Sequence, residues 1–419
     1  MGHFDRFSPE VAGYTALDIM LADIAVRIQL SPTDYQLAID HYQAIAEWID
    51  NKDSPLFGLV ELFYAQGGFS IGATIARHST DDEFDIDAMA QLALKASVDP
   101  EAALAILHAA IKRGPDTRYH EKVDRKTRCS TVNYDKMHLD VTPAVRIAGN
   151  DRASLIFHSK PEDPNEQKRS LHANPYGFGQ WFIANTPADD AFGRFFEKRS
   201  LDFARARAYR LMIEQKAETV PVPDQLPAYR KSLAVISLQL EKRWRNLGYD
   251  RRHAQLRRPP SVLLSYYNAR HANRTRTISE ELLHQISAQV AILEAADRDR
   301  RLICEFNPAC EYRRDELTDR WPGTLYDQRV FLDELVDFAT KIHRLRQGVR
   351  LDVMQAILAD LFGETPAAEA IKAQTSQRVA DRASGVSLYI PRSASVPPLG
   401  SLAVPAIARA APGNTYFGD

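Results

Sequence analysis

Cysteine is scarce in this sequence, with three residues among 419. Cys129, Cys304 and Cys310 are too few and too poorly spaced to form a zinc site, and no cluster of histidine and cysteine surrounds them. The sequence therefore offers no zinc centre, and we expect free thiols in a reducing compartment.

Long apolar runs and a net charge are also missing. No stretch approaches the roughly 20 apolar residues of a membrane-spanning helix, and residues 1–13 lack the basic-then-apolar pattern of a signal peptide. The formal net charge is only −2, which excludes a global attraction to nucleic acid or to an anionic membrane, so either role would need a local patch. We expect a cytoplasmic protein with no membrane partner.

The first half of the chain mixes helices and strands, in a sequence whose 45% apolar content is enough for a sizeable core. Ser31 before Pro32 predicts the start of a long amphipathic spine helix, and Asp99 before Pro100 predicts a second helix that ends at Gly114. Alternating or β-rich patterns predict strands at residues 60–65, 73–77, 83–92, 128–134, 137–147 and 153–158.

The second half is predicted to be helical. Residues 161–173 are polar and indicate a loop, and residues 174–182 indicate an aromatic, glycine-bearing turn that packs rather than catalyses. A helix at 188–216 and a proline-rich connector at 220–227 follow, and Thr277 with Glu280 is typical of a capping box. Further helices are predicted at residues 229–245, 259–272, 279–296, 326–346 and 351–361.

The predicted organisation is α+β with three parts. Residues 1–217 form a catalytic lobe that includes the spine helix, and residues 218–373 form a helical lobe. Residues 374–419 are rich in Ser, Pro, Ala and Gly without an apolar period, which is typical of a flexible tail.

Two carboxylates are the chemical centre of the first half. Asp85 and Asp87 stand two residues apart in a predicted strand, so both side chains point to one face, where they repel each other unless a cation lies between them. Upstream, Gln66, Gly67 and Gly68 form a turn with two positions free of a Cβ atom, where a phosphate can approach backbone N–H groups.

Either motif alone is common on solvated strand edges and in ordinary turns. Their order and spacing, together with a third carboxylate on a later strand, Asp140, indicate a nucleoside triphosphate site. Mg²⁺ prefers oxygen ligands, and three carboxylates can hold two ions about 3.5–4 Å apart for nucleotidyl transfer. We therefore expect Asp85, Asp87 and Asp140 to bind Mg²⁺, with Mn²⁺ as a substitute.

A basic stretch covers residues 242–276, in which Asp250 is the only acidic residue among ten lysines and arginines. Such a stretch is a solvated face, a triphosphate clamp or a nucleic-acid contact surface, and the sequence does not decide between them. Lys242 is the best single clamp because its predicted helix carries an apolar stripe that should face the catalytic lobe. Ser261 either binds a phosphate or base or caps its own helix.

Together these residues resemble a known family, the cyclic GMP-AMP synthase/DncV-like nucleotidyltransferases (CD-NTases) of bacterial CBASS anti-phage signalling. The likeness runs from about Gln66 to Trp321. The matching motifs are QGGFSIGAT, EFDID, RCSTVNYDKMHLDVTPA, NPYGFGQWF, KSLAVISLQLEKRWR, PPSVLLSYY and NPACEYRRDELTDRW.

The resemblance implies a polymerase-β-like lobe with a mixed sheet, a helical lobe of the poly(A)-polymerase and oligoadenylate-synthetase type, and a cleft between them. It implies that nucleoside triphosphates, ATP among them, are joined into a cyclic di- or trinucleotide that activates an effector. Carried over by position, Asp85, Asp87 and Asp140 are metal ligands. The nucleotide-binding residues are Gln66, Gly67, Gly68, Ser70, Lys242 and Ser261.

The sequence departs from this family at one turn residue. Where the family has a serine, this chain has Gly68, so a hydroxyl that would bind phosphate is missing, and Ser70 or Thr74 would have to replace it. The C-terminal Tyr416-Phe417-Gly418 resembles family tails on which accessory proteins act, although Asp419 follows; the alternative is a tail with no partner.

Two other functions stay open at the level of sequence. One is an enzyme that makes a linear product or transfers a nucleotide to RNA or protein. The other is a catalytically weak or inactive nucleotide-binding scaffold, which Gly68 favours and the three retained aspartates disfavour.

Overall fold

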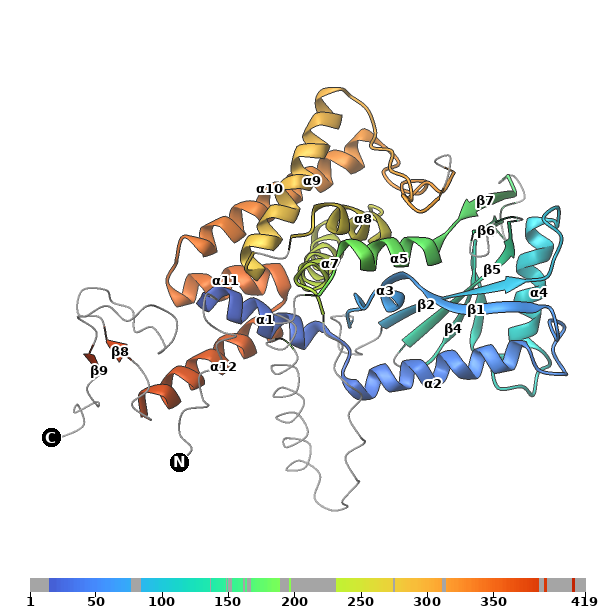
Figure 1. Ribbon diagram of the computed structural model, residues 1–419, viewed down its shortest axis with the longest axis horizontal. Helices are drawn as coiled ribbons and strands as arrows, with labels where there is room; N and C mark the ends of the chain where they lie inside the picture. The colour runs from blue at the N-terminus through green and yellow to red at the C-terminus, as the bar shows by residue number, and fades with distance from the viewer. Residues whose placement is uncertain are drawn as a thin grey trace, which may run out of the picture.

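The chain forms two lobes, a mixed sheet with flanking helices and a bundle of helices (Figure 1). No helix in the described part of the chain is both long and apolar enough to cross a membrane. The computed structural model describes residues 15–76, 84–135, 137–147, 149, 153–160, 163, 167–188, 196, 231–273, 276–310, 314–383, 388–389 and 409–410.

The sheet has one parallel pair at its centre. Its order is β1-β2-β5-β4-β3, and β6 and β7 extend it from β5. Only β2 and β5 run parallel, and the other pairs in this sheet are antiparallel. The strands are β1 (Val60–Gln66), β2 (Phe84–Leu92), β3 (Val123–Arg125), β4 (Ser130–Asn133), β5 (Met137–Arg146), β6 (Ser154–His158) and β7 (Arg169–Ala173).

One face of this sheet is buried against α2 (Pro32–Ile49) and α4 (Pro100–Lys112). Ser31 and Asp99 cap these helices through their side chains, as the sequence predicts. Because strand residues alternate, the even-numbered apolar residues of β2 enter this core with Leu139 and Val141 of β5, and the odd-numbered aspartates point to the opposite face. The core therefore fixes which face of the sheet carries the carboxylates.

The helical lobe has one continuous core that extends to the glycine turn and α5 (Pro175–Asn185). The capping box of Thr277 and Glu280 is present, which confirms that prediction. Its helices are α1 (Ala16–Ile28), α7 (Leu233–Arg252), α8 (Ser261–His271), α9 (Ile278–Arg298), α10 (Leu325–Arg346), α11 (Leu351–Phe362) and α12 (Glu364–Ala383).

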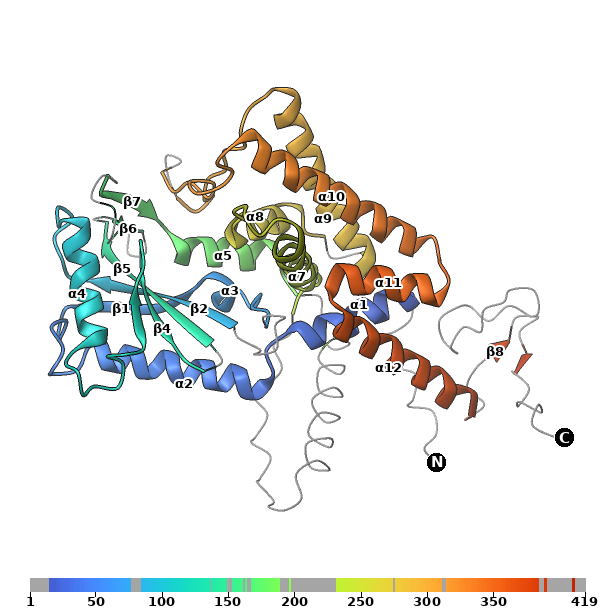
Figure 2. The ribbon, with the colours of Figure 1, turned by 180° about the vertical axis from the view of Figure 1, so that it is seen from behind.

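Helix α1 belongs to the helical lobe, although it lies at the start of the chain. It packs against α7, α9 and α12, and both ribbon views place it beside α12 (Figures 1 and 2). Its side chains are buried at most positions, and Thr15 forms a capping box with Asp18. This helix was not predicted from the sequence. Residues 16–28, which fall within the predicted catalytic lobe of residues 1–217, therefore pack with the helical lobe instead.

Three local predictions are wrong. Residues 73–76 form no strand, because Gln239 and Lys242 bind the carbonyl oxygens that a strand partner would take. Residues 169–173 are the edge strand β7 rather than loop, since they pair with β6. The aromatic turn is helix α5, because Asn174 accepts a hydrogen bond from Gly177 N and caps it.

At the end of the chain, α12 continues past residue 374 to Ala383. The helix continues because Gln374 is buried and its side chain donates to Ala16 O of α1. Short strands β8 (Leu388–Tyr389) and β9 (Arg409–Ala410) pair with each other. The predicted helix at 188–216 lies outside the described residues apart from Ala188 and Phe196, as do the connector at 220–227 and most of the predicted tail.

Asn174 joins the catalytic lobe to the segment between α9 and α10. Its Nδ2 donates to Ala309 O at 2.9 Å, and its backbone N donates to Asp315 Oδ2 at 2.9 Å. Asn307 Nδ2 donates to Asn174 O at 2.9 Å. These bonds hold the described residues of the 300–323 segment, 300–310 and 314–323, over the carboxylate face of the sheet.

Candidate active site

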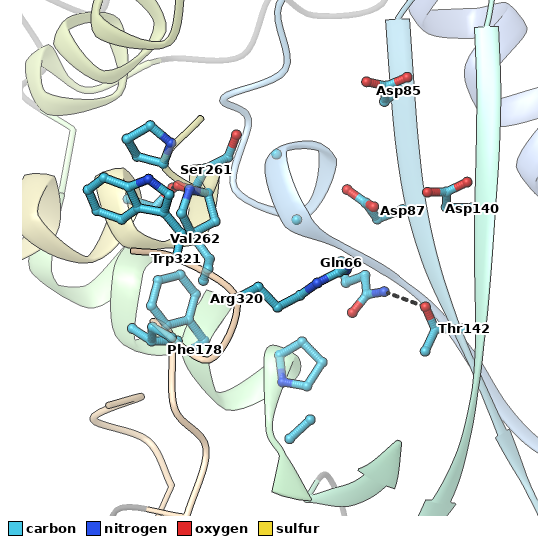
Figure 3. Close-up of a pocket in the computed structure, with 18 of the residues that line it drawn as sticks. Gln66, Asp85, Asp87, Asp140, Thr142, Phe178, Ser261, Val262, Arg320 and Trp321 are labelled. Carbon is cyan, nitrogen blue, oxygen red and sulfur yellow. Dashed lines mark hydrogen bonds between the residues drawn. The ribbon is translucent and has the colours of Figure 1, made fainter. Parts of the chain in front are cut away.

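Asp87 and Asp140 are direct neighbours on the parallel strands β2 and β5. The register pairs Asp87 with Asp140, and the close-up shows their carboxylates side by side on one face (Figure 3). The strand register therefore brings together two of the three carboxylates that the sequence predicts as metal ligands.

Asp85 lies two residues before Asp87, near the start of β2. It points to the same face as Asp87, because the two residues are i, i+2 on a strand, but Figure 3 shows its carboxylate apart from the other two. Within the described ranges, no group of three His, Cys, Asp or Glu side chains is close enough to hold one metal ion. The protein alone therefore preassembles a carboxylate pair, with Asp85 nearby.

The carboxylate pair is electrostatically strained. The pKa of Asp87 is raised to about 7, first by burial and then by repulsion from Asp140 and Asp85, against the lowering effect of the Lys242 ammonium. Burial also raises the pKa of Asp140, while a hydrogen bond from Thr131 Oγ1 at 2.5 Å lowers it. A bound cation would relieve this repulsion.

The glycine turn presses against Asp87. Gly67 has a φ of +61°, and a Cβ atom there would lie 2.3 Å from Asp87 Oδ2. Both the left-handed backbone and the close approach require glycine. The turn is the start of the short helix α3 (Gly67–Ser70), which follows β1 directly.

Lys242 reaches the same turn from α7. Its Nζ donates to Ala73 O at 2.8 Å and lies 3.0 Å from the position that a Cβ atom on Gly68 would take. Burial and the nearby Arg245 lower the pKa of Lys242 to about 8, whereas Asp87 and Asp85 raise it. The structure thus places this ammonium between the turn and the carboxylates.

Gln66 and Ser70 flank the turn with different hydrogen bonds. Gln66 Nε2 donates to Ala88 O at 3.4 Å. It also donates to Thr142 Oγ1 at 3.4 Å, the bond that is dashed in Figure 3. Ser70 Oγ donates to Gly67 O at 2.9 Å. Both residues line the same cavity as the aspartates.

Ser261 is the first residue of α8, but it does not cap this helix. The N-cap is Pro260, and no side chain caps the helix there. Instead, Ser261 Oγ accepts a hydrogen bond from Arg245 Nη2 at 3.1 Å, and Arg245 Nη1 donates to Pro259 O at 2.7 Å. Arg245 thus fixes the start of α8 at the cavity wall, a role that sequence spacing did not reveal.

The basic stretch is not one surface. Five of its basic side chains line the cavity, namely Lys242, Arg243, Arg245, Arg257 and Arg258, and Arg252 forms an ion pair with Glu334 of α10. Arg243 donates a hydrogen bond to Phe362 O, and Arg276 forms an ion pair with Glu281. The functions predicted for this stretch therefore apply to different side chains, because some line the cavity and others bind within the helical lobe. Arg274 lies outside the described residues.

The aspartates, the glycine turn, Lys242 and Ser261 line one cavity of about 1270 Å³ between the lobes. Several arginines on its wall were not predicted from the sequence. Arg320 extends from the 300–323 segment across the cavity toward Gln66 (Figure 3), and Arg128 of the catalytic lobe forms an ion pair with Asp319. The motif around Trp321 indicated this segment, but not which side chain enters the cavity.

Comparison with known proteins gives the family. A family model described as the Second Messenger Oligonucleotide or Dinucleotide Synthetase (SMODS) domain matches residues 17–163. The cyclic dinucleotide synthase CdnG of Bradyrhizobium diazoefficiens is 32% identical over 417 residues, which cover 96% of this chain and 95% of CdnG. The chain belongs to the CD-NTase family of nucleotidyltransferases.

Solved structures agree with this family. The structure of the Bradyrhizobium diazoefficiens CD-NTase CdnG in complex with GTP superposes with a TM-score of 0.73 and 32% identity, covering 86% of this chain and 100% of that one. CdnC of E. coli MS115-1, in complex with HORMA-deltaN, shares the fold with a TM-score of 0.50 and 14% identity, covering 82% and 96%.

The predicted α+β class and the two-lobe CD-NTase architecture are confirmed by these matches and by the sheet and helical lobe described above. All three cysteines are free thiols, also as predicted. The nine predicted site residues all line the cavity, and their roles in the CD-NTase reaction stay predictions.

Proposed function

We propose that this CD-NTase joins nucleoside triphosphates, with ATP or GTP among them, into a cyclic di- or trinucleotide that serves as a second messenger in anti-phage defence. In each step a ribose hydroxyl oxygen forms a bond to the α-phosphorus of a donor triphosphate, the bond to the β-phosphate bridge breaks, and pyrophosphate leaves. The observation that carries this proposal is the pairing of Asp87 with Asp140 beside Gly67 and Lys242 in one cavity.

Asp85, Asp87 and Asp140 are suited to hold Mg²⁺ or Mn²⁺. The donors are carboxylate oxygens, which hard divalent cations prefer. Burial and then repulsion from Asp140 and Asp85 raise the pKa of Asp87, and a bound cation would relieve that repulsion. Bound metal ions supply a lowered pKa for the attacking hydroxyl and neutralise charge on the leaving pyrophosphate.

The remaining cavity groups bind and orient the nucleotides. The side-chain-free Gly67-Gly68 turn lets a phosphate approach the backbone, Lys242 contributes positive charge beside it, and Ser261 is held at the cavity wall by Arg245. The volume of about 1270 Å³ exceeds the roughly 300–1000 Å³ of a pocket for one small molecule. We infer from this volume that two nucleotides share the cavity.

The CdnG structure in complex with GTP supports nucleoside triphosphates as partners here. Synthesis from these substrates also favours a cytoplasmic location. Accessory proteins that act on the C-terminal residues belong to the same proposal. Within the 242–276 stretch, activation by nucleic acid would use exposed arginines such as Arg257 and Arg258 at the cavity, whereas Arg252 forms an ion pair with Glu334 of α10.

The test is incubation of the purified chain with all four nucleoside triphosphates and Mg²⁺ or Mn²⁺. We expect a product that survives nuclease P1 and phosphatase digestion or is assigned by mass spectrometry as a cyclic oligonucleotide, and that is lost when EDTA is added. A product that phosphatase degrades would instead indicate a linear oligonucleotide. No product under any condition, including added nucleic acid or accessory proteins, would favour the scaffold function.

A further inference from the structure

The glycine turn lacks a side-chain hydroxyl, and the structure shows which nearby hydroxyl is available in its place. A phosphate oxygen only accepts hydrogen bonds, so a hydroxyl that binds it must donate its proton. Ser70 is the nearest in sequence, but its Oγ already donates to Gly67 O at 2.9 Å. Its proton is therefore committed to the backbone of the turn.

Thr74 is in the opposite situation. Its Oγ1 is buried, and it has no hydrogen-bond partner among the described residues. It lies 3.4 Å from the position that a Cβ atom on Gly68 would take, next to Lys242 Nζ at 3.0 Å from the same point. The free hydroxyl thus lies beside the place from which a turn serine would reach a phosphate.

The backbone that carries Thr74 is held from α7. Gln239 Nε2 donates to Thr74 O at 2.9 Å, and Lys242 Nζ donates to Ala73 O at 2.8 Å. Gln29 Nε2 of the segment after α1 donates to Gln239 Oε1 at 3.1 Å. The hydroxyl is therefore positioned before any nucleotide arrives, while the Lys242 ammonium keeps two further N–H donors.

We propose that Thr74 is a nucleotide-binding residue, whose hydroxyl donates to the triphosphate of the donor nucleotide together with Lys242. This inference rests on the proposed function, because it assigns a ligand to the donor triphosphate. Gly68 is then not a defect of the site: the space that its missing side chain leaves is shared by Lys242 and Thr74.

The test compares Thr74→Val, which keeps the shape and removes the hydroxyl, with Thr74→Ser, which keeps the hydroxyl. We measure the affinity of each protein for a nonhydrolysable GTP or ATP analogue with Mg²⁺, and its inhibition by inorganic tripolyphosphate. Because Thr74→Val loses a hydrogen bond to a charged group, its affinity for the analogue and its inhibition by tripolyphosphate should each weaken by roughly 10- to 100-fold. Thr74→Ser should recover most of this loss.

Thr340→Val is the matched control, because Thr340 is exposed on α10 and bonds only within its own helix. A purely structural role would lower the melting temperature of Thr74→Val, whereas removal of a buried, unpartnered hydroxyl should leave it unchanged or raise it. If Thr74→Val does not fold, Thr74→Ala compared with Thr74→Ser decides the question in the same way.

Wild-type affinity of Thr74→Val for both ligands would overturn the inference. The result is separable from the proposed function, because binding is measured without turnover. A wild-type protein that binds the analogue but forms no cyclic product contradicts the proposed function, and loss of that binding in Thr74→Val would still support the role of Thr74.

Discussion

At the residue scale, we expect Asp87 to be required for activity and to lower the stability of the metal-free protein. Asp87→Asn should lower product formation more than about 100-fold, since loss of even an outer-shell partner of a metal ligand costs roughly 10- to 100-fold. In EDTA its melting temperature should equal or exceed that of the wild type, because one of three repelling carboxylates is gone. Product assays and thermal melts measure both effects.

The control for Asp87→Asn is Asp333→Asn, at an exposed position on α10. It should change neither activity nor melting temperature. Wild-type turnover by Asp87→Asn would remove this residue from the catalytic centre.

Alanine substitutions at Gly67 and Gly58 distinguish the effect of backbone strain from the effect of a steric clash. Both have a positive φ, +61° and +71°, but a Cβ atom at Gly58 would meet no atom within 4 Å. Gly58→Ala should therefore cost only about 1–2 kcal/mol of unfolding free energy and retain activity. Gly67→Ala should have a similar stability cost and should also lower activity more than about tenfold, because its Cβ would displace Asp87. Steady-state kinetics and denaturant unfolding test the pair, and equal activity in both variants would contradict the contact.

The chemistry of single residues was partly predictable. The i, i+2 spacing of Asp85 and Asp87 fixes their common face by strand geometry alone, so that prediction needed no fold. Arg320 could not be found in this way, because it enters the cavity from a segment far from the catalytic strands in sequence. Only tertiary packing through Asn174 brings that segment over the sheet.

At the scale of elements, helix α7 carries a buried titrating group. Glu241 is fully buried and accepts a hydrogen bond from Gln289 Nε2 at 2.7 Å. Burial raises its pKa from an ordinary value of 4.5 to about 7, against the lowering effects of Gln289 and Arg245. The folded state therefore holds a proton that the unfolded state has lost between pH 4.5 and 7, and stability falls as pH rises through this interval.

Glu241→Gln should remove this part of the pH dependence. We expect the variant to gain roughly 2–4 kcal/mol relative to the wild type between pH 4.5 and 7, with the gain retained at higher pH and absent below pH 4.5. Chemical denaturation across the pH range measures it. Glu294→Gln, at an exposed position on α9, should follow the wild type, and a Glu241→Gln curve parallel to wild type would refute the prediction.

Elements with strong local signals were predictable, and elements specified by packing were not. Helix α2 has a capping serine before a clear apolar stripe. Strand β7 is polar and pairs only with β6 at the sheet edge, so nothing in its own residues distinguishes it from a loop. Helix α5 contains Gly177 and Gly179, which lower helix propensity, and its capping residue Asn174 was the one available signal.

At the scale of the molecule, α1 should stabilise the whole helical lobe. Leu21 is fully buried in α1 within the core that also contains α7. Leu21→Ala should lower the unfolding free energy by about 2–5 kcal/mol, whereas Leu351→Ala, at a position 50% exposed, should cost far less. Thermal unfolding compares them, and equal costs would mean that α1 does not belong to this core.

The contact between α1 and α12 also has a consequence for synthesis on the ribosome. Arg27 binds Glu369 at 3.2 Å across 342 residues of sequence, and at roughly 5–20 residues per second the later helix emerges roughly 20 to 70 s after the earlier one. Until then α1 has no α12 to pack against, and the lobe that positions Lys242 is incomplete. A chain cut short before α12 therefore lacks the helix that packs against both α1 and α11, so the helical lobe is completed only after residues 364–383 have been made.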